Sequence, residues 1–210
     1  MKKKLRNIIL ISFSIVLSFC LFYFGTDGFQ AYTAESARIY RLMEEKPFFP
    51  NVTLEDSKER VYEFTEFEGK YAVLTFIYTS CTDVCPQLEM NLAEVYKQIP
   101  SELLGEEIMF LSISFDPDRD DPKTLEKYQH FFSSDGETWR MARINNEEQL
   151  SSLLDEFGVI VLPDGEGGFT HNSAFYFVGR DGELLDVMDY KKTDEAAVKI
   201  MDTLQNDMEG

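Results

Sequence analysis

Two cysteines, Cys81 and Cys85, have the residue type and the spacing that could do chemistry. They follow the apolar, β-rich run 71–78 and lie at the start of a segment, 86–98, whose apolar residues have helical spacing. Side chains four residues apart on a helix lie on one face, so both sulfurs can point the same way. A helix N-terminus favours thiolate, the form that attacks disulfides and binds soft metals. Open α/β sheets bind ligands at the carboxyl ends of their strands, so we predict an active pair rather than two inert thiols or a static disulfide.

The chain contains two histidines, and only one is placed to join the cysteines. His130 lies in the amphipathic segment 122–132 and is expected to be a partly exposed helical residue. His171 follows the glycine-rich loop 164–168 and directly precedes a predicted strand. If that strand neighbours the strand leading to Cys81, His171 can lie over the cysteine pair. We therefore predict His171 as the third member of the site.

Two thiolates and one imidazole form a soft set of three metal ligands. Such a set suits Cu(I), and with a fourth ligand it can hold Cu(II). Zinc could use the same residues together with a water molecule. Asp83, between the cysteines, is either an occasional oxygen ligand or a solvated loop acid. Because the sequence offers one such set, Cys81, Cys85 and His171, we expect one metal ion per chain.

A second motif, DPDRDD at 116–121, has the alternating acids that begin a calcium-binding loop. The sixth position of such a loop needs glycine, and the twelfth needs glutamate. Here those positions hold Asp121 and Lys127, so the sequence argues against a calcium site.

The predicted elements around these residues alternate between strand and helix. Short strands are expected at 52–54, at 61–64 and near Met141, with buried strands at 71–78 and 108–115 and a hairpin pairing 175–178 with 183–188. Helices are expected at 86–98, at 122–132, from Asn145 to about 158, and from Thr193 to about 206. A parallel β-α-β start followed by an antiparallel hairpin and a helix predicts a thioredoxin-like α/β fold, with a central mixed sheet flanked by helices.

The N-terminal segment 1–25 is predicted to be a transmembrane anchor. Four basic residues precede the uncharged run Ile8–Phe24, and roughly 17–25 apolar residues span a bilayer as a helix. Basic residues favour the cytoplasmic side, so a single-pass anchor with an extracytoplasmic domain is expected. A cleaved signal peptide or lipidation at Cys20 is disfavoured, because no A-x-A-like site follows and Phe19 replaces the small residue that lipidation needs.

The rest of the chain divides into a stalk and a domain. Residues 26–46 are polar and are expected to form a partly helical stalk, and 47–208 the thioredoxin-like domain. Acidic residues outnumber basic ones by 38 to 20, giving a net charge of −18. Phosphate backbones repel so acidic a protein, which argues against nucleic-acid binding.

Three segments resemble the Sco/SenC family when they are taken in order. They are TFIYTSCTDVCPQL at 75–88, SISFDPDRDDPKTLEKY at 112–128 and FTHNSAFYFVGRDG at 169–182. The resemblance extends over about 48–201 and implies a membrane-anchored, thioredoxin-fold copper protein. It implies copper ligands at Cys81, Cys85 and His171, with the two cysteines forming a redox-active pair that is a disulfide when oxidised.

The same resemblance implies a role in assembling the dinuclear copper site of cytochrome c oxidase. The expected partners are the copper-bearing subunit of the oxidase, a copper donor or thiol reductant, and the membrane. One departure is Ser80-Cys81-Thr82, where many family members have histidine before the first cysteine and proline after it. Neither of these positions is a ligand, so the metal assignment is unaffected.

Two functions remain open from the sequence, a copper metallochaperone and a thiol–disulfide oxidoreductase that keeps the oxidase cysteines reduced. Thioredoxin-type redox enzymes use C-x-x-C and usually a cis-proline before the facing strand. Here the cysteine spacing is one residue longer, and Thr170–Ser173 contains no proline. We therefore favour the metallochaperone over a classical enzyme, although thiol–disulfide exchange through Cys81 and Cys85 stays open. A peroxidase is disfavoured, because Arg140 and Arg143 are far from the motif in sequence.

Overall fold

The computed structural model describes residues 2–25 and 33–209, which fall into two units, Met1–Glu45 and Lys46–Gly210. The first unit contains the helices α1 (Lys2–Gly25) and α2 (Ala34–Glu45). Within α1, Arg6–Gly25 is long and apolar enough to cross a membrane. The helix expected within the segment 26–46 is present as α2, while residues 26–32 of that segment lie outside the described residues.

The start of α2 is fixed by reciprocal capping. The Ser36 backbone N–H donates to Thr33 Oγ1 at 3.0 Å, and the Thr33 N–H donates to Ser36 Oγ at 2.9 Å. Side-chain oxygens at this position satisfy N–H groups that have no partner within the helix. The helix therefore begins at Ala34, directly after Thr33.

A seven-stranded mixed sheet forms the centre of the second unit, in the order β2-β1-β5-β4-β3-β8-β9. The strands are β1 (Thr53–Asp56), β2 (Val61–Glu63), β3 (Tyr71–Ile77), β4 (Ile108–Ser114), β5 (Trp139–Arg143), β8 (Phe175–Val178) and β9 (Leu184–Met188). β3, β4 and β5 run parallel, whereas β8 lies antiparallel to β3 with Leu74 opposite Tyr176. The strand before Cys81 therefore neighbours the strand after His171, as predicted.

Every residue of β3 and β4 is buried, which explains their continuous apolar sequences. Successive side chains point to opposite faces of a sheet. Phe76 packs against Tyr176 and Phe157 on one face, with ring centroids 5.2 and 6.3 Å away. Thr75 points to the other face, where α3 lies, because its hydroxyl contacts Glu89 of that helix.

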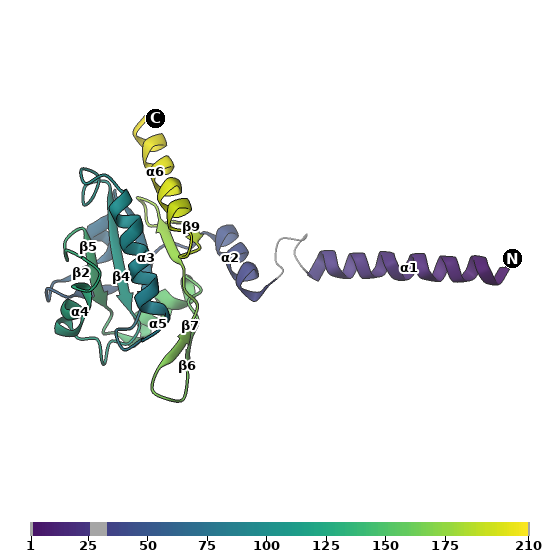
Figure 1. Ribbon diagram of the computed structural model, residues 1–210, viewed down its shortest axis with the longest axis horizontal. Helices are drawn as coiled ribbons and strands as arrows, with labels where there is room; N and C mark the ends of the chain where they lie inside the picture. Colours follow the sequence, from purple (N-terminus) through teal and green to yellow (C-terminus); the bar gives the residue numbers. More distant parts are fainter. Residues whose placement is uncertain (1, 26–32, 210) are drawn as a thin grey trace. The chain divides into compact units, whose positions relative to one another are not determined.

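Helices cover the sheet: α3 (Val84–Gln98), α4 (Pro122–Gln129), α5 (Glu147–Glu156) and α6 (Thr193–Glu209). α3 and α6 pack side by side, and α3 crosses in front of β4 (Figure 1). A short 3-10 helix, η1 (Phe64–Phe67), precedes β3. The predicted mixed sheet flanked by helices is thus confirmed.

Some predicted boundaries were wrong. α5 is capped by Asn146, whose Oδ1 accepts from the Gln149 N–H at 2.9 Å, and not by Asn145. Asn145 instead donates to Glu55 Oε2 at 2.7 Å. The helix expected from Pro86 begins at Val84, so Cys85 already belongs to its first turn.

The loop before His171 forms a hairpin that the sequence did not predict. β6 (Val161–Pro163) and β7 (Phe169–His171) pair antiparallel, with Val161 opposite His171, and the hairpin extends from the body (Figure 1). Its turn is held by Asp164 Oδ1, which accepts from the Glu166 and Gly168 N–H groups at 2.7 and 2.9 Å. His171 is therefore carried on a strand rather than on a flexible loop.

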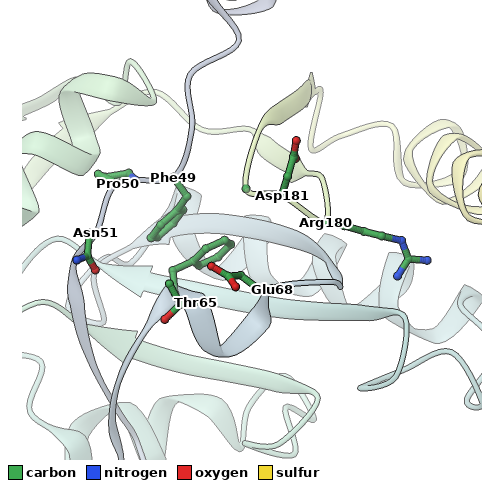
Figure 2. Close-up of a pocket in the computed structure, with 9 residues that line it drawn as sticks. Phe49, Pro50, Asn51, Thr65, Glu68, Arg180 and Asp181 are labelled. Carbon is green, nitrogen blue, oxygen red and sulfur yellow. The ribbon is translucent and has the colours of Figure 1, made fainter.

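The domain begins at the end of the sheet opposite to the cysteines. The Phe49 N–H donates to Gly182 O at 2.8 Å, in the turn between β8 and β9 beside the start of β3. Phe49 stacks on Phe64 with ring centroids 3.8 Å apart, and both line a small cavity at this end. Phe49 points into the cavity, while the Arg180 guanidinium points away from it (Figure 2) and pairs with Glu107.

Buried Asp120 joins the loop after β3 to the end of β4. Its carboxylate accepts from the Thr79 N–H at 2.9 Å and from the Ser114 hydroxyl at 2.5 Å. Unpaired buried donors are costly, so Asp120→Ala should lower the free energy of unfolding by about 1–3 kcal/mol. Denaturation followed by Trp139 fluorescence measures this, and exposed Asp118→Ala is the matched control. Equal stability of the two variants would contradict a structural role for Asp120.

Candidate metal centre

Cys81 and Cys85 occupy the turn that joins β3 to α3. The Cys81 N–H donates to Tyr78 O at 3.2 Å, which folds the chain back after β3. The Cys85 N–H then donates to Cys81 Sγ at 3.3 Å, so this sulfur accepts a hydrogen bond from the first turn of the helix. Cys85 is fully buried, whereas Cys81 is partly exposed. The two thiols thus have different access to solvent.

His171, the last residue of β7, completes the group. Its Nε2 lies 3.3 Å from Cys85 Sγ, and the three ligand atoms of Cys81, Cys85 and His171 all lie within 4.8 Å of one another. Its Nδ1 lies 3.0 Å from Asn172 O, an acceptor, so a neutral ring carries its proton there. The Nε2 lone pair is then directed at the sulfurs, as in a metal-binding histidine.

The surroundings give the three groups different pKa values. Burial would raise the pKa of Cys81, but the N–H groups of Cys85 and Asp83 directed at its sulfur outweigh burial and hold that pKa below its usual value. Burial raises the pKa of Cys85 far above its usual value, and the adjacent Cys81 adds to the effect. Burial also lowers the pKa of His171, although its bond to Asn172 opposes this. A reactive thiol, a buried thiol and a neutral imidazole therefore face one another.

Aromatic rings pack against His171, which is partly exposed. The Phe115 ring centroid lies 5.0 Å from the imidazole centroid, and the Tyr78 centroid lies 6.2 Å away. Phe169 packs edge-on against both rings, at 5.7 and 5.3 Å. These contacts hold the histidine against the β3–α3 turn.

The other sequence candidates lie apart from this group. Asp83 is exposed, and its contact with the site is through its backbone N–H on Cys81. His130 is the exposed C-cap of α4. Among the residues that the structure describes, the group able to hold a metal consists of Cys81, Cys85 and His171.

Sequence reasoning missed Glu89, which is fully buried one helical turn after Cys85. Its two carboxyl oxygens each lie 2.7 Å from a hydroxyl, one of Thr75 and one of Ser112, and these hydroxyls lie 3.0 Å apart. Each of these three oxygen–oxygen contacts needs one hydrogen, and the hydroxyls of Thr75 and Ser112 supply two. A protonated Glu89 supplies the third, which agrees with burial raising its pKa to about 7. The signal in the sequence is an acid three residues before Leu92, beside the apolar face of the helix.

Fold and site together define a thioredoxin-like protein with two cysteines and one histidine at the carboxyl end of its central strand. The model of the SCO1/SenC family matches residues 42–206. The chain belongs to the SCO1/SenC family.

Relatives agree with this assignment. The chain is similar to the SCO1 protein homolog of Bacillus subtilis (strain 168), with 27% identity over 144 residues that cover 68% of this chain and 72% of that protein. The structure of Bradyrhizobium japonicum ScoI with copper bound has a TM-score of 0.62 and 23% identity, covering 73% of this chain and 98% of that chain. BsSco, described as a member of the Sco family of cytochrome c oxidase assembly proteins, has a TM-score of 0.64 and 21% identity, covering 76% and 95%. The two structural likenesses establish the fold.

The difference between the two thiols predicts selective alkylation. In the reduced, metal-free chain, iodoacetamide should modify Cys81 at least about tenfold faster than Cys85, because only Cys81 combines a lowered pKa with exposure. Cys81 should also keep reacting at a lower pH than an ordinary thiol. Fragment-ion mass spectrometry of the peptide 71–97 separates the two sites. Equal rates would contradict the assignment.

Glu89 predicts a pH-dependent contribution to stability. Burial raises its pKa from 4.5 to about 7, so between these values the folded chain binds more protons than the unfolded chain. The contribution of this group to stability therefore falls as pH rises through that window. Glu89→Gln should gain stability relative to the parent over the same range, by at most about 3 kcal/mol. Unfolding curves near pH 5 and pH 8 test this, and a pH-independent difference would show that the pKa is not raised.

Proposed function

We propose that this chain is a membrane-anchored, extracytoplasmic copper metallochaperone that acts in assembly of the dinuclear copper site of cytochrome c oxidase. The observation that carries the proposal is the convergence of two sulfurs and one imidazole nitrogen within 4.8 Å. Copper is the cargo, bound one per chain by Cys81, Cys85 and His171.

The donor set suits copper on chemical grounds. Thiolate and imidazole are ligands that Cu(I) prefers, and Cu(II) lies above zinc in the Irving–Williams order. The lowered pKa values of Cys81 and His171 mean that fewer protons compete for those two ligands at neutral pH. Cys85 must lose its proton on binding, so loading releases protons and weakens in acid.

Relatives and the N-terminal helix support the cellular part of the proposal. A structural neighbour holds copper, and another is described as belonging to a family of cytochrome c oxidase assembly proteins. The apolar part of α1, Arg6–Gly25, fits a membrane anchor. The basic residues before it favour the cytoplasmic side, which supports an extracytoplasmic domain.

A second function, thiol–disulfide exchange with the oxidase cysteines, is favoured by one observation. Cys81 is partly exposed and has a lowered pKa, whereas Cys85 is buried and has a raised pKa. Such a pair can work as an attacking and a resolving thiol. His171 separates the two functions, because a dithiol needs no imidazole ligand to reduce a disulfide.

Copper titration of the reduced chain tests the metal site. We expect one copper per chain, with sulfur-to-Cu(II) charge-transfer absorption that disappears in the Cys81→Ser and Cys85→Ser variants. His171→Ala should weaken binding but keep the sulfur absorption. Unchanged stoichiometry in the double serine variant would overturn the site assignment.

Cells carrying only His171→Ala distinguish the two functions. For a chaperone, oxidase activity should fall nearly to the level of a deletion strain and recover partly with added copper, but not with an added small-molecule thiol. Loss of either cysteine disables both mechanisms and serves as the reference. Full oxidase activity in the His171→Ala strain would favour the reductase.

A further inference from the structure

The motif DPDRDD at 116–121, whose pattern argues against calcium, forms the turn between β4 and α4. The Arg119 N–H donates to Asp116 O at 3.2 Å, which closes the turn. The Arg143 guanidinium, on β5, donates to Pro117 O at 2.7 Å. The turn is thus fixed to the body of the domain.

The Arg119 side chain reaches from this turn to the β6–β7 hairpin, which carries His171. Its Nη1 donates to Gly167 O at 2.6 Å, and its Nε donates to the carboxylate of buried Asp116. The guanidinium carbon also lies 5.4 Å from the Phe169 ring centroid, within range of a cation–π contact. One side chain therefore joins the β4–α4 turn to two residues of the hairpin.

The hairpin contacts the domain through side chains rather than through the central sheet. Among the described strands, β6 and β7 pair with each other and lie outside the seven-stranded sheet. Alternate residues of a strand share a face, so Phe169 and His171 point the same way from β7. The Phe169 ring centroid lies 5.3 Å from that of Tyr78, and His171 Nε2 lies 3.3 Å from Cys85 Sγ. A contact that holds Phe169 in place therefore also holds the imidazole.

We propose that Arg119, oriented by Asp116, is the positioning residue that holds the β6–β7 hairpin, and with it His171, against the cysteine pair. The guanidinium presents donors on separate nitrogens of a rigid plane, so it can bind the Asp116 carboxylate and the Gly167 carbonyl at once. The ion pair with Asp116 sets the direction of this plane, and the bond to Gly167 fixes the hairpin. For the copper-bound chain, the inference rests on the proposed function, because it concerns the third ligand of the same site.

Two variants separate this attachment from the general loss of an arginine. Arg119→Met removes the guanidinium and keeps a long apolar side chain. Arg140→Met is the matched control, because Arg140 makes the same kinds of contact with β2 and η1. Its guanidinium pairs with Glu66 at 2.5 Å and lies 4.9 Å from the Tyr62 ring centroid.

Amide hydrogen exchange, read by NMR in the reduced, metal-free full chain in detergent, tests the attachment. The Phe169 N–H donates to the Tyr78 hydroxyl at 3.2 Å, so its exchange reports local release of β7 from the domain. Arg119→Met should speed this exchange about two- to tenfold, the range for one hydrogen bond. Arg140→Met should leave it unchanged. A parental rate in Arg119→Met, or equal acceleration in Arg140→Met, would overturn the proposal.

Copper binding gives a readout that a purely structural role would not move. Loss of a cation should by charge alone raise the affinity for Cu(II), whereas loss of positioning should lower it. We expect Arg119→Met to lower Cu(II) affinity about two- to tenfold. It should also weaken the nitrogen hyperfine coupling of His171 in the electron paramagnetic resonance spectrum, with the sulfur absorption retained.

The copper measurements distinguish failure of this inference from failure of the proposed function. Parental or raised affinity in Arg119→Met, or a parental nitrogen coupling, would overturn the positioning role and leave the proposed function standing. If His171→Ala itself leaves copper binding unchanged, the proposed function fails, and the metal-free exchange result alone decides whether Arg119 holds the hairpin.

Discussion

Burial of β3 on both faces is the constraint on which the site depends. A strand with no exposed residue must end in a turn before the chain can reach solvent, and Cys81 lies in that turn. Cys85 follows in the first turn of α3, which packs against the same sheet and takes its thiol out of water. The contrast between an accessible and a buried sulfur thus follows from where the buried strand stops.

The balance between hydrogen-bond donors and acceptors explains much of the chemistry around this turn. The Cys81 sulfur accepts N–H groups of the helix start, which favours its thiolate. Glu89, one helical turn after Cys85, contacts the hydroxyls of Thr75 and Ser112, which also contact each other, and a proton on its carboxyl group supplies the third hydrogen that these contacts need. The Tyr78 hydroxyl donates to Phe169 O and accepts from the Phe169 N–H.

Much of this arrangement could be predicted from the sequence, because the signals are local and strong. The apolar runs of β3 and β4 indicated buried strands, and the order of elements placed the strand after His171 beside the strand before Cys81. The three-residue strands β6 and β7 were missed, since a turn rich in glycine gives no alternating pattern. The contact between Tyr78 and Phe169 spans 91 positions and has no local signal at all. Asn145 and Asn146 could each cap a helix, and the bond of Asn145 to the distant Glu55 has no local signal in the sequence.

The attachment of Phe49 to the turn after β8 has a mechanical consequence. The domain is held at one end of the sheet, and the cysteines lie at the other end of β3, which has 7 residues. At roughly 3.3 Å per residue, the site lies about 20 Å along β3 from that attachment. A rotation of the domain about its first residues by a modest angle would carry the sulfurs through an arc of several ångströms, without any rearrangement of the core.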